Sequence, residues 1–175
     1  MLGLPVPLTS HQILAMNLIT DVLPALGVVL QQPEHHHLAT LAREGTSALE
    51  TPLRHEVFGR SAATAGPSLT AYLLALRGGT PLARTIAYTS IITTQLAQTL
   101  DAGRTRGGRS RSVQGVVAGS AGLLAGTLAI RPVRSFLGLV PPTPFGWVLV
   151  GAATGAAVVL GRTLASPGPP EPELA

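Results

Sequence analysis

Three oxygen-bearing side chains lie close together in an apolar stretch near the start of the chain. Asn17, Thr20 and Asp21 stand within the apolar run 13–30, and Asp21 is the only acid buried deep in any apolar run. Residues three and four apart share one face of a helix. A carboxylate in hydrocarbon costs about 2.5 kcal/mol or more, so an acid at this position predicts a function. Amide, hydroxyl and carboxylate oxygens are the ligands that hard cations prefer.

Pro24 follows this cluster by three residues and affects the backbone beside it. Proline has no N–H to donate, and its ring clashes with the preceding turn of a helix. The disturbed turn holds Thr20 and Asp21, so we expect carbonyl oxygens to be freed there for a ligand. The alternative is an interhelical hydrogen-bond cluster, in which Asn17, Thr20 and Asp21 only hold the bundle together.

The composition is typical of a membrane protein. Of the 175 residues, 46% are hydrophobic and 11% are charged, and the mean hydropathy is +0.39. Soluble domains carry about 25% charged residues. Aromatic residues make up 3%, whereas 20 glycines and many alanines suit close contacts between membrane helices. Cysteine is absent, which excludes disulfides, thiolate metal sites and a cysteine nucleophile.

Five apolar runs predict an all-α fold, a polytopic membrane helix bundle of about five transmembrane helices. The expected helices are 13–30, 57–76, 82–100, 113–130 and 145–162. They form one domain, 1–165, followed by a disordered Pro/Glu-rich tail, 166–175. A soluble helical protein is disfavoured by the hydropathy and by the acid in mid-run.

Details of these runs predict how the helices pack. The third run is rich in threonine and serine, so we expect neighbouring helices to shield it from lipid. Gly122 and Gly126 have the spacing of a helix–helix contact. Residues 35–55 are expected to form a polar loop, and 135–144 an apolar connector.

The arginines orient the predicted bundle, because they are the only strongly basic residues of the chain. One side of the five spans carries Arg43, Arg54, Arg60, Arg104, Arg106, Arg109, Arg111 and Arg162. The other side carries Arg77, Arg84, Arg131 and Arg134. The positive-inside rule places the larger group in the cytoplasm. We therefore expect a multi-pass protein of the plasma membrane with a cytoplasmic C-terminus. Its N-terminus would lie outside without a signal peptide, which suggests that an upstream segment is missing.

The other polar clusters of the sequence do not point to one specific function. The arginines at 104–111 suit either anionic lipid head groups or a role in topology alone. Nucleic-acid binding is not expected, because no aromatic stacking platform accompanies them. His35, His36 and His37 are adjacent and cannot easily all turn to one ion, which favours a solvated loop over a metal site. The chain has no Gly-x-Ser-x-Gly elbow and no triad spacing, so no catalytic residue is predicted.

A family resemblance runs along most of the chain. The run Asn17-Leu18-Ile19-Thr20-Asp21 with Leu23-Pro24-Ala25 resembles the sixth transmembrane helix of P-type cation-transporting ATPases. Ala83-Arg84-Thr85-Ile86-Ala87-Tyr88-Thr89 resembles their eighth helix, and Val140-Pro141-Pro142 the connector into the tenth. The likeness covers about residues 5–163 in family order. The loop 33–60 and the third run are most similar to the actinobacterial branch.

The resemblance implies that Asn17, Thr20 and Asp21 coordinate the transported cation in mid-membrane. It also implies further ligands from the fourth and fifth helices, which the chain lacks. Gln95 and Gln98 stand near the place of another ligand in some relatives; neither is charged, so one cation site or none is expected.

The resemblance also implies which partners the chain has. Without lysine the chain cannot contain the Asp-Lys-Thr-Gly-Thr phosphorylation motif. We therefore expect no cofactor in this chain and no ATP hydrolysis by it alone, whereas the complete pump would use Mg-ATP. The expected partners are the cation, membrane lipid and a separate chain or missing N-terminal half that carries the ATPase domains. The alternative is a non-catalytic remnant or an assembly protein without transport.

Overall fold

The structure is a computed structural model that describes residues 5–22, 51–105 and 111–164. These residues are all-helical, and no strand occurs among them. The chain begins with α1 (Ser10–Asn17), which runs into a π-helical turn, η1 (Leu18–Val22). Three long helices follow, α4 (Thr51–Ala75), α5 (Thr80–Thr105) and α6 (Arg111–Ala129). The short α7 (Arg131–Phe136) then leads into α8 (Pro144–Leu164).

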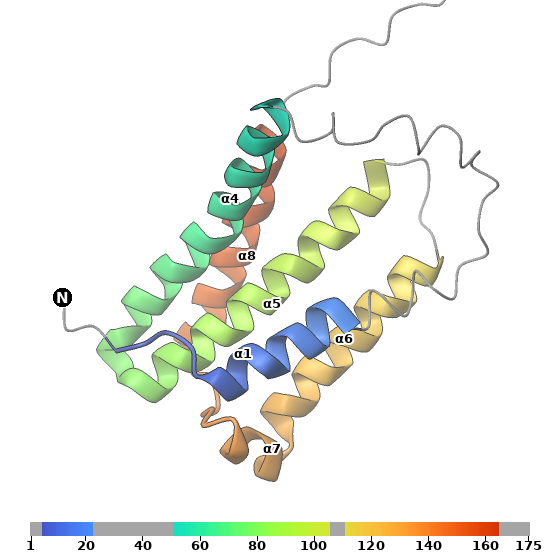
Figure 1. Cartoon of the computed structure of the whole chain (residues 1–175). Helices are drawn as coiled ribbons and strands as arrows, with labels where there is room; N and C mark the ends of the chain where they lie inside the picture. Colours follow the sequence, from blue (N-terminus) through green and yellow to red (C-terminus); the bar gives the residue numbers. More distant parts are fainter. Residues whose placement is uncertain (1–4, 23–50, 106–110, 165–175) are drawn as a thin grey trace, which may run out of the picture.

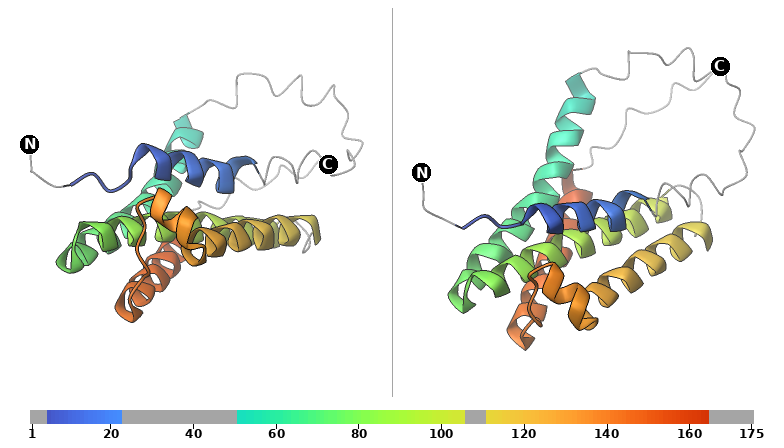
Figure 2. Two further views of the ribbon diagram at one scale, coloured as in Figure 1. Left: turned by 90° about the horizontal axis from the view of Figure 1, so that it is seen from below. Right: turned by 60° about the horizontal axis from the view of Figure 1, so that its bottom comes forward.

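Helix α5 lies at the centre of the bundle (Figure 1). On one side α4 and α8 pack against α5 and against each other, and on the other side α6 and η1 contact it. A single 3₁₀ turn, η3 (Leu76–Gly78), reverses the chain between α4 and α5. Gly79 closes this turn with a φ of 97°, a conformation that side chains other than hydrogen disfavour. Figure 2 shows α1 and η1 alongside α5 from two further directions.

Two apolar clusters meet on α5. The first joins α4, α5 and α8 and is built largely of alanine, with Ala71, Ala75, Ala83, Ala87 and Ala153 all buried. Such small side chains let helix backbones approach closely. The second joins η1, α5, α6 and the α7–α8 connector through Ile19, Tyr88, Ile92, Leu96, Val117, Leu124, Leu137 and Leu139. One helix therefore contributes to both halves of the core.

The threonine-rich helix α5 is shielded by its neighbours, as its low hydropathy predicted. Thr85, Thr89, Ser90 and Thr94 are all 0% exposed. Thr85 and Thr89 donate hydrogen bonds to the carbonyls four residues earlier, at 2.9 and 2.8 Å. Bonds of this kind satisfy hydroxyls inside the helix that carries them. Thr85, Thr89 and Ser90 can thus be buried without a partner from water, whereas Thr94 Oγ1 has no hydrogen-bond partner among the described residues.

Hydrogen bonds between side chains join α5 to α4 and to α8. The Thr64 hydroxyl of α4 donates to Gln98 Oε1 at 2.9 Å, and the hydroxyls of Thr93 and Thr154 lie 2.8 Å apart between α5 and α8. Near the end of both helices, Arg162 Nε donates to Asp101 Oδ2 at 3.0 Å. Asp101 lies in the last turns of α5, which ends at Thr105 and so extends beyond the expected end at residue 100.

Other helix bounds also differ from the expected ones. Helix α4 begins at Thr51, inside the predicted polar loop; Pro52 suits a first turn, where no N–H needs a partner. The expected connector 135–144 starts within a helix, because α7 extends from Arg131 to Phe136. Arg134 of α7 donates to the backbone oxygen of Leu128 at 2.8 Å and so satisfies a carbonyl at the end of α6. A helix of six residues is too short to show a periodic pattern.

The glycine contact expected on α6 does not form within the described residues. Gly122 is exposed, and a Cβ added to it would meet nothing within 4 Å. A Cβ on Gly126 would meet only the Ile130 side chain of the same chain segment, at 3.9 Å. The small-residue face of α6 points away from α5 and η1, which Val117 and Leu124 contact instead.

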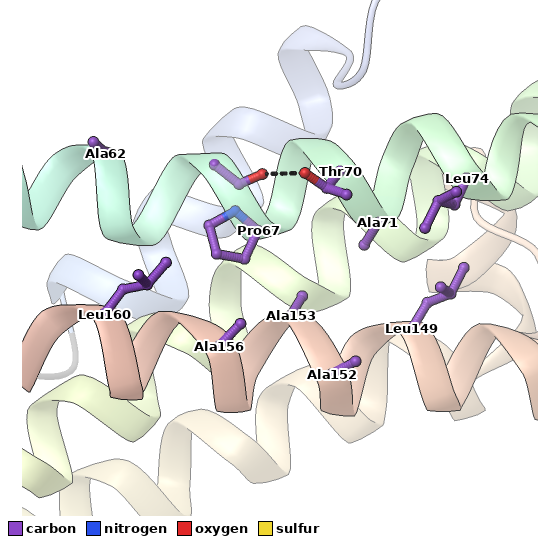
Figure 3. Close-up of a pocket in the computed structure, with 11 residues that line it drawn as sticks. Ala62, Pro67, Thr70, Ala71, Leu74, Leu149, Ala152, Ala153, Ala156 and Leu160 are labelled. Carbon is purple, nitrogen blue, oxygen red and sulfur yellow. Dashed lines mark hydrogen bonds between the residues drawn. The ribbon is translucent and has the colours of Figure 1, made fainter.

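An apolar groove of about 460 Å³ separates α4 from α8 over part of their length (Figure 3). Small side chains line it on both helices, with Ala62 and Ala71 on one and Ala152 and Ala156 on the other. Pro67 lies inside α4 at this groove, and the helix continues through it. The Thr70 hydroxyl donates to the backbone oxygen of Gly66 at 2.9 Å, so the polar atom of the groove is satisfied.

In the described part of the chain, one helix is long and apolar enough to cross a membrane by length and composition. It covers Pro144–Thr163 of α8 with a mean hydropathy of 1.6. A shorter apolar helix covers Val113–Ala129. Helix α5 is rich in hydroxyl side chains, which lower its mean hydropathy.

Candidate cation site at the helical turn

The helix that carries the candidate site is held at its start by a capping box. The Thr9 hydroxyl accepts from the Gln12 backbone N–H at 3.4 Å, and Gln12 Oε1 accepts from the Thr9 N–H at 2.9 Å. This reciprocal pair satisfies N–H groups that the first turn leaves unpaired. Gln12 Nε2 also donates to the backbone oxygen of Leu137 at 2.9 Å, in a fully buried position. The start of α1 is thereby fixed to the α7–α8 connector.

The regular helix changes to a wider π-helical turn at Leu18–Val22. Single π-helical turns leave carbonyl oxygens out of register and often occur at functional sites. Here two of the carbonyls accept from hydroxyls. Met16 O accepts from Thr20 Oγ1 at 3.0 Å, and Ile19 O accepts from Ser120 Oγ of α6, also at 3.0 Å.

Pro24 was expected to free carbonyl oxygens in the turn that holds Thr20 and Asp21. The backbone departs from the α-helix there and forms a π-helical turn. The carbonyls of Met16 and Ile19 accept from hydroxyls of the protein. Pro24 lies outside the described residues, so freed carbonyls at Thr20 and Asp21 stay a prediction.

Of the three predicted site residues, the structure brings two together. Thr20 Oγ1 lies 3.2 Å from Asp21 Oδ1, and Asp21 is exposed while Thr20 is partly buried. Asn17 is exposed one turn earlier, and its side chain forms no hydrogen bond with the residues that the structure describes. Ile19 is the buried residue of the turn, at 2% exposure. The turn therefore buries one apolar side chain and leaves three oxygen-bearing side chains accessible.

Two or three side chains do not complete a site for a hard cation, which takes six or more oxygen ligands in the case of calcium. Within residues 5–22, 51–105 and 111–164, no group of three or more histidine, cysteine, aspartate or glutamate residues could hold a metal ion. A cation bound at this turn would therefore need further oxygen ligands.

The glutamines of α5 have different surroundings. Gln98 accepts a hydrogen bond from Thr64 and lies between α4 and α5. Gln95 Oε1 is buried and has no hydrogen-bond partner among the described residues. His35, His36 and His37 lie outside the described residues, as do Arg106 and Arg109.

The residue that sequence reasoning missed is Ser120. It is 0% exposed and contacts the backbone of the predicted site from a helix about a hundred positions away. The sequence signal is weak, since a single serine in the Gly/Ala-rich run 113–130 can equally bond to its own helix.

A comparison with known families identifies the chain. Residues 5–165 match the family described as "Cation transporting ATPase, C-terminus". The chain belongs to this family. The match covers every described residue, including the whole π-helical turn and α8. It confirms the resemblance to the C-terminal domain of P-type cation-transporting ATPases.

Curated relatives of this C-terminal domain carry the same kind of name. The chain is 28% identical over 174 residues to a probable cation-transporting ATPase I of Mycobacterium leprae. The aligned region covers 88% of this chain and 11% of the relative. A protein of the same name from Mycobacterium tuberculosis matches equally, over 10% of its length. The calcium-transporting ATPase of Bacillus subtilis is 28% identical over 162 residues, or 18% of its length. The chain thus spans a small part of the relatives that it matches.

Proposed function

We propose that this chain is the C-terminal membrane part of a P-type cation pump and supplies one wall of the transmembrane cation site. The observation that carries the proposal is the π-helical turn. Thr20 and Asp21 lie together on it, accessible, while Ile19 anchors its other side in the core. A turn fixed on one side and open on the other suits a site that is completed by further helices.

The helix lengths support a membrane bundle of five spans. The four long helices contain 25, 26, 19 and 21 residues. With a rise of 1.5 Å per residue, even the shortest reaches about 28 Å, close to the ~30 Å of a bilayer core. The fifth span is the run 13–30, whose start is α1 and η1. In this arrangement the arginine distribution orients the C-terminus to the cytoplasm.

The proposed cation is bound by oxygen ligands and is the cargo of the pump. Asp21 supplies the negative charge, and Thr20 and Asn17 supply neutral oxygens. Oxygen ligands of this kind select hard ions. ATP binding, phosphorylation and the remaining ligands belong to the part of the pump outside these 175 residues.

The proposal is tested by expressing this chain together with the ATP-driven half and measuring cation-stimulated ATPase activity. Asp21→Asn keeps the shape of the side chain and removes its charge, so half-maximal stimulation should require at least tenfold more cation. Asp101→Asn is the matched control, because Asp101 pairs with Arg162 at the end of α5 and lies away from the turn. Unchanged cation dependence in Asp21→Asn would remove Asp21 from the pathway. Cation-independent or absent turnover in the unmodified pair would favour a remnant without transport.

A further inference from the structure

The hydroxyl of Ser120 forms a buried contact between α6 and the turn that carries Asp21. Ser120 Oγ donates to the backbone oxygen of Ile19 at 3.0 Å across 101 positions of sequence. Ser120 is 0% exposed and Ile19 is 2% exposed. The turn η1 contacts α6, and the helix α1 that leads into it runs beside α6 in Figure 1.

The carbonyl of Ile19 lies in the core, where a donor matters. Ile19 is 2% exposed, and a buried carbonyl without a donor costs about 1–3 kcal/mol. Pro24, shortly after the turn, has no N–H to donate. The Ser120 hydroxyl supplies Ile19 O with a donor from another helix.

The serine is not needed for apolar packing at this place. Val117 and Leu124 of α6 are already buried in the cluster that contains Ile19. A serine in mid-helix commonly bonds to a carbonyl of its own helix. Ser90 does this on α5, where its hydroxyl donates to Ala87 O at 3.1 Å. The Ser120 hydroxyl instead donates to the carbonyl of Ile19 in the π-helical turn. Ile19 directly precedes Thr20 and Asp21 in the sequence.

We infer that Ser120 is a positioning residue of the cation site, which fixes the π-helical turn and thereby the direction in which Thr20 and Asp21 present their oxygens. The inference rests on the proposed function, because it assigns a role within that site. Ser120 itself does not touch the cation. Its hydrogen bond holds the buried side of the turn, so the open side keeps one geometry.

The test uses the whole chain, co-expressed with the ATP-driven half and reconstituted with it in lipid nanodiscs, with two readouts. Hydrogen exchange of the backbone amides in Leu18–Val22 reports whether the turn is held, and loss of the free Mn²⁺ resonance signal reports cation binding. Four variants are compared: Ser120→Ala, Ser120→Thr, Ser90→Ala and Asp21→Asn. Ser120→Thr keeps a hydroxyl, and Ser90→Ala removes an equally buried hydroxyl that bonds only within its helix. Helix content measured by circular dichroism shows that each variant has folded.

Ser120→Ala should speed exchange in the turn and raise the Mn²⁺ dissociation constant about five- to tenfold, as expected for one lost hydrogen bond. Ser120→Thr should restore both values toward the unmodified chain, and Ser90→Ala should change neither. If Ser120→Ala speeds exchange but leaves Mn²⁺ affinity unchanged, Ser120 is a structural contact only and the inference is wrong. The inference is also wrong if Ser120→Ala changes neither readout while Asp21→Asn weakens Mn²⁺ binding, and the proposed function then stands. If Asp21→Asn binds Mn²⁺ like the unmodified chain, the assignment of Asp21 as a ligand fails, and with it the role given to Ser120.

Discussion

The side-chain nitrogen Nε2 of Gln12 lies 2.9 Å from the backbone oxygen of Leu137, 125 positions further along the chain. The same side chain caps its own helix, because Gln12 Oε1 accepts from the Thr9 N–H. One buried amide thus fixes both the start of α1 and its place against the α7–α8 connector. The helix that carries the candidate cation site is anchored at Gln12 and again at Ile19.

Replacing Gln12 by leucine should therefore destabilise the fold. The substitution keeps the approximate size of the side chain but leaves Leu137 O and the Thr9 N–H without their partner. We expect a loss of about 1–3 kcal/mol in the free energy of unfolding, measured by denaturant titration in detergent micelles. Gln114→Leu on the exposed face of α6 is the control and should stay within about 0.5 kcal/mol. Equal losses in the two variants would contradict the anchoring role.

The hydrogen bond between Thr93 and Thr154 should show a measurable coupling between α5 and α8. Their hydroxyls lie 2.8 Å apart, and either can donate. A double-mutant cycle with Thr93→Val and Thr154→Val should give a coupling energy near 0.6 kcal/mol, the average for such bonds between membrane helices. The same cycle with Thr99→Val in place of Thr93→Val should give no coupling, since Thr99 bonds to Gln95 O of its own helix. Additive effects of Thr93→Val and Thr154→Val would show that the contact is not formed.

A side chain at Gly146 is predicted to destabilise the fold, because α8 meets the buried Ile86 of α5 closely there. A Cβ on Gly146 would lie 2.7 Å from Cδ1 of Ile86, which is fully buried. Gly146→Ala should cost about 1–2 kcal/mol of stability through overpacking.

Gly151 provides the control for this substitution. A Cβ there would meet nothing within 4 Å, and Gly151→Ala should leave stability unchanged or raise it by up to about 1 kcal/mol through helix propensity. Both variants are compared by thermal unfolding in the same detergent. A Gly146→Ala protein as stable as Gly151→Ala would rule out the close contact with Ile86.

The proposed orientation can be measured directly, because the chain has no cysteine. Ser135→Cys on the exposed face of α7 should react with a membrane-impermeant maleimide added to intact cells. Ala175→Cys at the C-terminus should react only after the cells are opened. The reverse pattern would invert the orientation, and labelling of both positions in intact cells would exclude an odd number of spans between them.

Sequence and structure agree most closely where a signal is local. The capping box of Thr9 and Gln12 joins residues three positions apart and forms where α1 begins. The proline at position 24 predicts a disturbed turn, and the turn before it is π-helical. The hydroxyl-rich run 82–100 predicts a shielded helix, and α5 lies at the centre of the bundle. Each of these depends on interactions within a few residues or on the cost of exposing a whole helix face.

The sequence by itself determined the family, the all-helical fold class and the residue types of the candidate site. Each of these depends on motif spacing or hydropathy, which are properties of residues close together along the chain. Tertiary structure alone decided which distant groups meet. It turned the small-residue face of α6 away from the core. It also assigned the carbonyl of Ile19 to Ser120, a partner 101 positions away. No local sequence pattern predicts such a bond, because a serine hydroxyl can equally donate to a carbonyl of its own helix. Only the packing of α6 against η1 brings Ser120 close to the carbonyl of Ile19.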